Sequence, residues 1–136
     1  MTAIGIIGRK GRMGQALVEA IAEAGQSHAG GADQGDDITE LVAASDVLVD
    51  FSSPKALQAT LDACIAAGKP VVIGTTGLED ADHAAIDEAA EQIPILQTGN
   101  TSLGVNMLAA LVEQAASRLG DDWDIEILEM HHRHKV

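Results

Sequence analysis

Short apolar runs alternate with longer segments of helical periodicity along most of the chain. The short runs predict strands, and the segments in which apolar residues recur every three or four positions predict helices. The expected strands are Ala3–Ile7, Ser27–Gly31, Asp46–Asp50, Pro70–Gly74, Pro94–Gln97 and Trp123–Met130. The expected helices are Arg12–Ala24, Ile38–Ala44, Pro54–Ala67, Glu79–Glu91 and Leu103–Arg118. This alternation is typical of strand–helix–strand units around a parallel sheet.

The stretch DVLVDF at 46–51 indicates that helices cover both faces of this sheet. Its apolar residues are consecutive, as in strands that are buried on both sides. Two helix starts are also marked, by Pro54 behind Ser53 and by the acids Glu79 and Asp80. We therefore predict the α/β class, with a Rossmann-type doubly wound parallel sheet.

Composition narrows the classes of partner. The 136 residues carry 21 acidic and 8 basic side chains, a net charge of −13, which argues against nucleic acid and against an acidic membrane surface. No apolar run approaches the roughly 20 residues that span a bilayer. Cys64 is the single cysteine and cannot form an internal disulfide, so we expect a cytoplasmic protein.

A glycine-rich loop, GRKGRMG at 8–14, lies between the first predicted strand and the first predicted helix. Gly8, Gly11 and Gly14 allow a tight turn, close approach of a pyrophosphate to the backbone and close helix–strand packing. The helix N-terminus would then face the anion. A purely structural turn is the alternative explanation.

Asp33 comes 19 positions after Gly14 (33 minus 14), near the place where dinucleotide-binding folds carry a ribose-binding acid. A carboxylate there favours the free 2′-hydroxyl of NADH. Arg9, Lys10 and Arg12 crowd the same region and could neutralise the 2′-phosphate of NADPH, so both cofactors stay open. The alternative is that these three bases belong to a solvated loop.

Three polar segments follow successive predicted strands: DFSSP at 50–54, GTTG at 74–77 and TGNTSLG at 98–104. Ligands of open parallel sheets bind beyond the carboxyl ends of the strands. Each segment alone could be ordinary turn chemistry. Because all three fall at the same edge, they favour a nicotinamide pocket.

The last stretch, EMHHRHKV, holds three of the five histidines together with Arg133 and Lys135. Groups of this kind usually face an anion or carry protons, and imidazole can donate a proton near neutral pH. A zinc site is an alternative, although no cysteine or regular ligand spacing supports it. A cloning-tag remnant is another.

These motifs together resemble one family. GRKGRMG, DVLVDFSSP, GKPVVIGTTGL, GNTSLGVN and EMHHRHK, in this order, are similar to the bacterial dihydrodipicolinate reductases, also called 4-hydroxy-tetrahydrodipicolinate reductases. The resemblance covers the whole chain. It implies reduction of a cyclic imine dicarboxylate to tetrahydrodipicolinate with NADH or NADPH, in the diaminopimelate route to lysine. It also implies a dinucleotide-binding domain at 1–102 and the beginning of an α+β substrate domain at 103–136, which in the full-length family protein forms a homotetramer.

The resemblance also implies roles for individual residues. His131 matches the proton donor, and His132 and Lys135 match groups that bind and polarise the substrate, so His131 and Lys135 are the catalytic candidates. No metal is expected. With Arg9 and Lys10 added from the glycine loop, the cofactor-binding candidates are Gly8, Arg9, Lys10, Gly11, Arg12, Met13, Gly14, Asp33, Phe51, Ser52, Gly74, Thr75, Thr76, Asn100 and Ser102.

Two departures from the family pattern affect the functional prediction. The hinge motif N-F-S reads NTS here, with Thr101 in place of the aromatic residue, and the sequence ends at Val136, before the D-A-P-S-G-T motif that grips a substrate carboxylate. The alternative function is therefore a non-catalytic NAD(P)H-binding fragment. A Rossmann reductase acting on an aspartate-derived aldehyde is a further rival. It predicts a catalytic cysteine or a distal lysine, but Cys64 lies inside a predicted helix.

Overall fold

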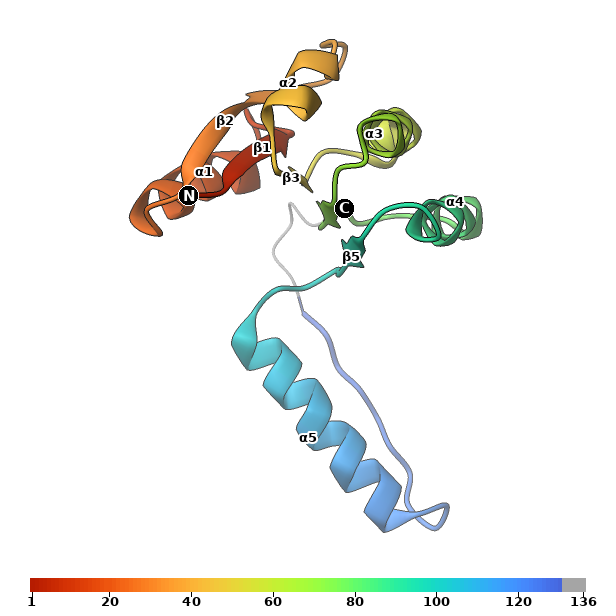
Figure 1. Ribbon diagram of the computed structural model, residues 1–136. Helices are drawn as coiled ribbons and strands as arrows, with labels where there is room; N and C mark the ends of the chain where they lie inside the picture. Colours follow the sequence, from red (N-terminus) through yellow and green to blue (C-terminus); the bar gives the residue numbers. More distant parts are fainter. Residues whose placement is uncertain (131–136) are drawn as a thin grey trace. The chain divides into compact units, whose positions relative to one another are not determined.

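The computed structural model describes residues 1–130 and contains a five-stranded sheet in which all neighbouring strands are parallel (Figure 1). The strand order is β2-β1-β3-β4-β5. The strands are β1 (Ala3–Ile7), β2 (Ser27–Ala32), β3 (Val47–Asp50), β4 (Val71–Ile73) and β5 (Ile95–Gln97). The order reverses direction next to β1, because the chain passes first to β2 on one side and then to β3 on the other.

Helices connect the strands: α1 (Arg12–Glu23), α2 (Thr39–Ala44), α3 (Pro54–Ala67) and α4 (Asp80–Ala90), with α5 (Leu103–Leu119) after the last strand. α2 contacts α3, and α3 contacts α4, so these three follow one another along the sheet (Figure 1). Since parallel crossovers are right-handed, α1 covers one face and α2, α3 and α4 cover the opposite face. The predicted doubly wound sheet is confirmed. No helix in residues 1–130 is both long and apolar enough to cross a membrane.

The core is built from aliphatic side chains of the sheet and of the helices on it. Leu48 of β3 and Ile73 of β4 are fully buried, and Leu57, Leu61 and Cys64 of α3 pack in the same cluster. Burial of a Leu or Ile side chain contributes about 1.5–3 kcal/mol. The carboxyl edge of the sheet is thereby held by a rigid interior.

The chain divides into two units, Met1–Gly99 and Asn100–Val136. All the buried core residues belong to the first unit. In the second unit, α5 has no buried residue, and apolar side chains such as Leu103, Met107 and Leu108 are exposed. The second unit therefore leaves most of its apolar surface uncovered by its own described residues.

The predicted strand at Trp123–Met130 is wrong: the structure forms no strand there. The sequence alternates in the required way, but a strand also needs a neighbour to complete its backbone hydrogen bonds. The one sheet formed by residues 1–130 consists of β1 to β5, and this segment is not among its strands.

Candidate functional site

The carboxyl ends of β1 and β3 form the topological switch point of the sheet. Crossovers leave this point in opposite directions, which opens a crevice where ligands of such folds bind. The glycine loop follows β1, Asp33 follows β2 and Ser52 follows β3. The sequence motifs of the first unit therefore gather at one edge.

Two glycines of the loop are required by the fold itself. Gly8 has φ +86°, and a Cβ there would lie 2.6 Å from the carbonyl oxygen of Phe51. Gly14 is buried in α1, and its Cβ would lie 2.6 Å from Cα of Arg9 and would overlap the carbonyl oxygen of Gly8. Gly8 makes the turn, and Gly14 brings α1 against the loop.

Gly11 differs, because nothing within the described chain requires a glycine there. Its φ of −68° and ψ of 165° suit any residue, and a Cβ would meet only the carbonyl oxygen of Gly8, at 3.3 Å. Gly11 is the N-cap of α1, and no side chain makes a capping hydrogen bond there within the described residues. No side chain of the described residues therefore competes with an external acceptor for the N–H groups of the first turn.

Asp33 is joined to the glycine loop by its neighbour Lys10. The backbone N–H of Lys10 donates to Oδ1 of Asp33 at 2.9 Å, and Nζ of Lys10 lies 3.7 Å from Oδ2. On the other side, the N–H of Asp33 donates to Oδ2 of Asp36 at 2.9 Å. A carboxylate and an ammonium group therefore lie together at the end of β2, where a ribose would be recognised.

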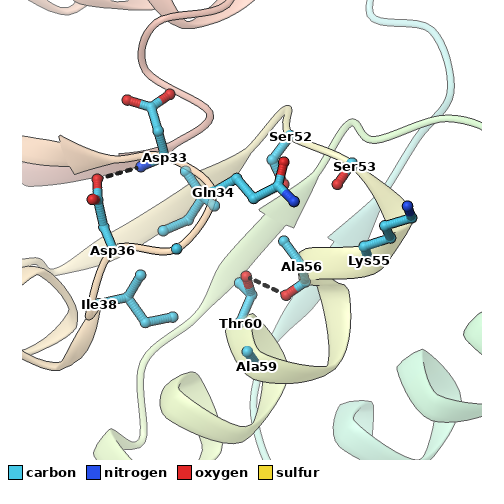
Figure 2. Close-up of a pocket in the computed structure, with 12 residues that line it drawn as sticks. Asp33, Gln34, Asp36, Ile38, Ser52, Ser53, Lys55, Ala56, Ala59 and Thr60 are labelled. Atoms are coloured by element: carbon cyan, nitrogen blue, oxygen red, sulfur yellow. Dashed lines mark hydrogen bonds between the residues drawn. The ribbon is translucent and has the colours of Figure 1, made fainter.

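A pocket of about 290 Å³ opens between the loop after β2 and the start of α3 (Figure 2). Asp33 and Gln34 line the side formed by the β2 loop. Ala56 and Ala59 of α3 line the other side, and Lys55 also contributes to the lining. An apolar slot beside a carboxylate matches the needs of an adenine ring attached to a ribose.

The loops after β3 and β4 meet at the same edge. Thr75 is buried, and its Oγ1 accepts from the N–H of Ser52 at 3.1 Å. A Cβ on Gly74 would overlap the ring of Phe51, so the ring lies directly over Gly74. Thr76 is exposed beside them. The predicted meeting of the DFSSP and GTTG segments is confirmed.

The remaining cofactor candidates are placed as follows. The side chain of Arg9 lies over Gly31 of β2, and Arg12 and Met13 are exposed in the first turn of α1.

Asn100 and Ser102 belong to the second unit, where Ser102 caps α5 by accepting from the N–H of Val105 at 3.4 Å. Their roles toward a cofactor stay predictions.

The tail candidates His131, His132 and Lys135 lie outside the described residues, as does the rest of the histidine cluster. Within residues 1–130, no group of three or more His, Cys, Asp or Glu side chains is arranged to hold a metal ion.

Three residues of this region were not identified as candidates from the sequence. Gln34 and Lys55 line the pocket, and Asp50 is fully buried between the loops after β3 and β4. A carboxylate that ends an apolar strand was the available signal for Asp50. Gln34 and Lys55 are separated by 21 positions (55 minus 34) and give no signal of their own.

Cys64 lies in the core, and burial together with the negative charge of Asp50 raises its pKa to about 11. The thiolate is the reactive form of cysteine, so this thiol is a poor nucleophile at neutral pH. The rival activity on an aspartate-derived aldehyde therefore has no suitable cysteine nucleophile in this chain.

We expect Cys64 in the folded chain to react with iodoacetamide at least about 100-fold more slowly at pH 8 than in the urea-unfolded chain. A shift from the ordinary 9.0 to about 11 lowers the thiolate fraction by about that factor, and burial slows access further. Mass spectrometry of timed samples measures both rates. Similar rates in the folded and unfolded chain would show that the thiol is accessible and ionised.

Comparison with known proteins gives two family matches. Residues 2–101 match the family described as "Dihydrodipicolinate reductase, N-terminus", and residues 104–136 match the family described as "Dihydrodipicolinate reductase, C-terminus". A protein of Zymomonas mobilis subsp. mobilis named 4-hydroxy-tetrahydrodipicolinate reductase is 54% identical over 139 residues, covering 97% of this chain and 55% of that protein. One of the same name from Halorhodospira halophila is 44% identical, covering 98% and 59%. The chain thus spans somewhat over half the length of these relatives.

A solved structure shares the fold. The dipicolinate-bound dihydrodipicolinate reductase from Paenisporosarcina sp. TG-14 superimposes with a TM-score of 0.68 at 20% sequence identity, covering 86% of this chain and 54% of that one. At this identity, the match supports the Rossmann-like fold and nothing finer.

Proposed function

The chain belongs to the dihydrodipicolinate reductase family, and on that premise we propose that it serves the reduction of 4-hydroxy-tetrahydrodipicolinate to tetrahydrodipicolinate by NADH or NADPH, in the diaminopimelate route to lysine. The observation that carries the cofactor half of this proposal is Gly11. Its backbone angles suit any residue, a Cβ there would meet only the carbonyl oxygen of Gly8, and it stands at a helix N-terminus without a side-chain cap in the described residues. This arrangement fits the approach of a pyrophosphate.

The first unit would hold the cofactor in three places along the carboxyl edge. The adenine would enter the pocket beside α3, with Asp33 accepting from a ribose hydroxyl. The pyrophosphate would meet the N–H groups of the first turn of α1. Phe51, Ser52, Thr75 and Thr76 would surround the nicotinamide, which supplies a hydride when bound in its reduced form.

The tail would serve the substrate. On the strength of the family resemblance, His131 donates a proton to the substrate atom that gains electron density as the hydride arrives. His132 and Lys135 neutralise the substrate carboxylates. These local cations matter in this chain, because its net charge of −13 repels a dicarboxylate from most of the surface.

We also propose an alternative function, because the chain covers only 55% of its Zymomonas mobilis relative. In this alternative, the chain binds NADH or NADPH but does not reduce the substrate.

One experiment separates the two functions. The purified 136-residue chain is supplied with substrate made in situ by the preceding synthase, and nicotinamide oxidation is followed by absorbance while cofactor binding is followed by calorimetry. Turnover supports the reductase, binding without turnover supports the alternative, and absence of both contradicts the proposal.

Asp33→Ala is expected to weaken NADH binding about tenfold and to leave NADPH binding unchanged or stronger. Loss of a charge-assisted hydrogen bond costs about 1.5–3 kcal/mol, whereas a 2′-phosphate gains from removal of the nearby carboxylate. Asp37→Ala removes the same charge from the same loop outside the pocket and is the matched control. Equal losses of affinity for NADH and NADPH would show that Asp33 does not bind the ribose.

For the full-length family protein we also propose a cytoplasmic homotetramer. The family resemblance and the unburied apolar side chains of α5 support the assembly, since exposed apolar surface marks interaction sites. Sedimentation velocity of the purified protein measures the assembly state.

A further inference from the structure

The carboxyl edge contains a buried carboxylate that the proposed function leaves without a task. Asp50 ends β3 and is 0% exposed. Its Oδ1 accepts from the N–H of Ser52 at 2.9 Å, from the hydroxyl of Ser52 at 2.6 Å and from the hydroxyl of Thr75 at 3.0 Å. Three donors from two loops therefore converge on one oxygen.

Stability of the fold is a poor explanation for a carboxylate in this place. Burial of a carboxylate is costly unless its hydrogen bonds are complete, and apolar replacements of buried charges are often neutral or stabilising. Oδ2 of Asp50 is buried and has no hydrogen-bond partner within the described residues. The bonds of Oδ1 are charge-assisted, so they fix geometry more firmly than neutral bonds would.

What Asp50 fixes is the relative position of two loops. Ser52 lies on the loop after β3 and Thr75 on the loop after β4, and the N–H of Ser52 also donates to Oγ1 of Thr75. The N–H of Gly74 donates to the carbonyl oxygen of Asp50 at 2.9 Å, and the ring of Phe51 covers Gly74. Ser52, Gly74 and Thr75, three of the residues expected around the nicotinamide, are therefore tied to this one side chain or to its backbone.

We propose that Asp50 is a positioning residue for the nicotinamide side of the cofactor site. This inference rests on the proposed function. Asp50 acts through Ser52 and Thr75 and does not touch the cofactor, because its side chain is closed off from solvent. On the adenosine side, Asp33, Lys10 and Gly11 are held by other bonds. Ser52 is the one residue lining the pocket beside α3 to which the Asp50 side chain is hydrogen-bonded, so we expect the adenosine side to depend on Asp50 much less than the nicotinamide side does.

The test compares NADH with ADP-ribose, which carries the same adenosine and pyrophosphate but no nicotinamide. Asp50→Asn keeps the size of the side chain and removes its charge. We expect its affinity for NADH to fall about tenfold while its affinity for ADP-ribose stays within about twofold, both measured by calorimetry on the 136-residue chain. Ser45→Ala alters another fully buried polar side chain, which precedes β3 whereas Asp50 ends it, and is expected to lower the unfolding temperature without this selectivity.

A second set of variants keeps the inference testable if Asp50→Asn does not fold. Ser52→Ala and Thr75→Val each remove one donor to Asp50, and the double variant is expected to lose less NADH affinity than the two single losses together. Additive losses, or equal losses of NADH and ADP-ribose, would overturn the positioning role and leave the proposed function standing. Failure of the unaltered chain to bind either ligand would overturn both.

Discussion

Gly11→Ala is expected to lower the affinity for NADH about 10- to 100-fold while leaving the fold nearly intact. The added methyl group would occupy the space in which a pyrophosphate approaches the N-terminus of α1, and loss of charge-assisted hydrogen bonds there costs about 1.5–3 kcal/mol. Within the protein, the same methyl group would meet only the carbonyl oxygen of Gly8, at 3.3 Å. Its cost in the free energy of unfolding should stay below about 1 kcal/mol.

Gly14→Ala is the matched comparison, because it adds the same methyl group three residues further on. There the methyl group would lie 2.6 Å from backbone atoms of Arg9, which α1 cannot avoid without shifting. Overpacking of this kind costs about 1–3 kcal/mol. Calorimetric titration and thermal unfolding of both variants separate a binding defect from a folding defect. If Gly11→Ala bound NADH normally, the anion site would have to lie elsewhere.

The two variants also show what the spacing of glycines could not reveal. The sequence predicts three glycines in one loop, yet each is a glycine for a different reason: a left-handed turn at Gly8, helix packing at Gly14 and outward space at Gly11. Only the surroundings of each Cα distinguish these reasons. A motif therefore predicts the place of a site better than the task of each residue in it.

Most of the sheet and its helices could be predicted because each element carries its own periodicity. β1 and α3 begin and end at the predicted residues, since Ile7 is followed by a glycine turn and Pro54 and Gly68 bound the helix. Strand formation at Trp123–Met130 could not be judged in this way, because it depends on a pairing partner. Local alternation carries no information about such a partner.

Asp50 shows the same limit within the site. Its position at the end of an apolar strand suggested only a boundary, whereas its hydrogen bonds join loops that are 23 positions apart (75 minus 52). The pocket could not be predicted for the same reason. Gln34 follows β2 and Lys55 follows β3, and only the order of the strands brings both residues to the lining of one pocket. The composition also does not predict the local charge of the site. The chain has a net charge of −13, whereas the proposed anion site depends on backbone N–H groups and a few local cations.

His131→Gln is expected to slow turnover about 100- to 10,000-fold while changing NADH affinity less than about twofold. General acid catalysis typically contributes that much to a rate, and a glutamine amide cannot supply the proton that imidazole can hold and release near neutral pH. Residues that hold the cofactor in the proposal lie elsewhere in the sequence, so binding should be spared. The measurement is the steady-state rate of nicotinamide oxidation in a chain that turns substrate over, either this one or one extended with the remaining residues of the Zymomonas mobilis relative.

His134→Gln is the control for this prediction, because it removes the same group from the same short stretch at a position to which no role is assigned. A role in proton donation requires a large loss of turnover for His131→Gln and a small one for His134→Gln, with the Michaelis constant for NADH unchanged in both. Equal losses of turnover at a fixed, subsaturating substrate concentration would mean that the tail acts through its total positive charge on a dicarboxylate. In that case the Michaelis constant for the substrate should rise in step with each cation removed, and turnover at saturating substrate should recover. Unchanged turnover in His131→Gln would end its assignment as the proton donor.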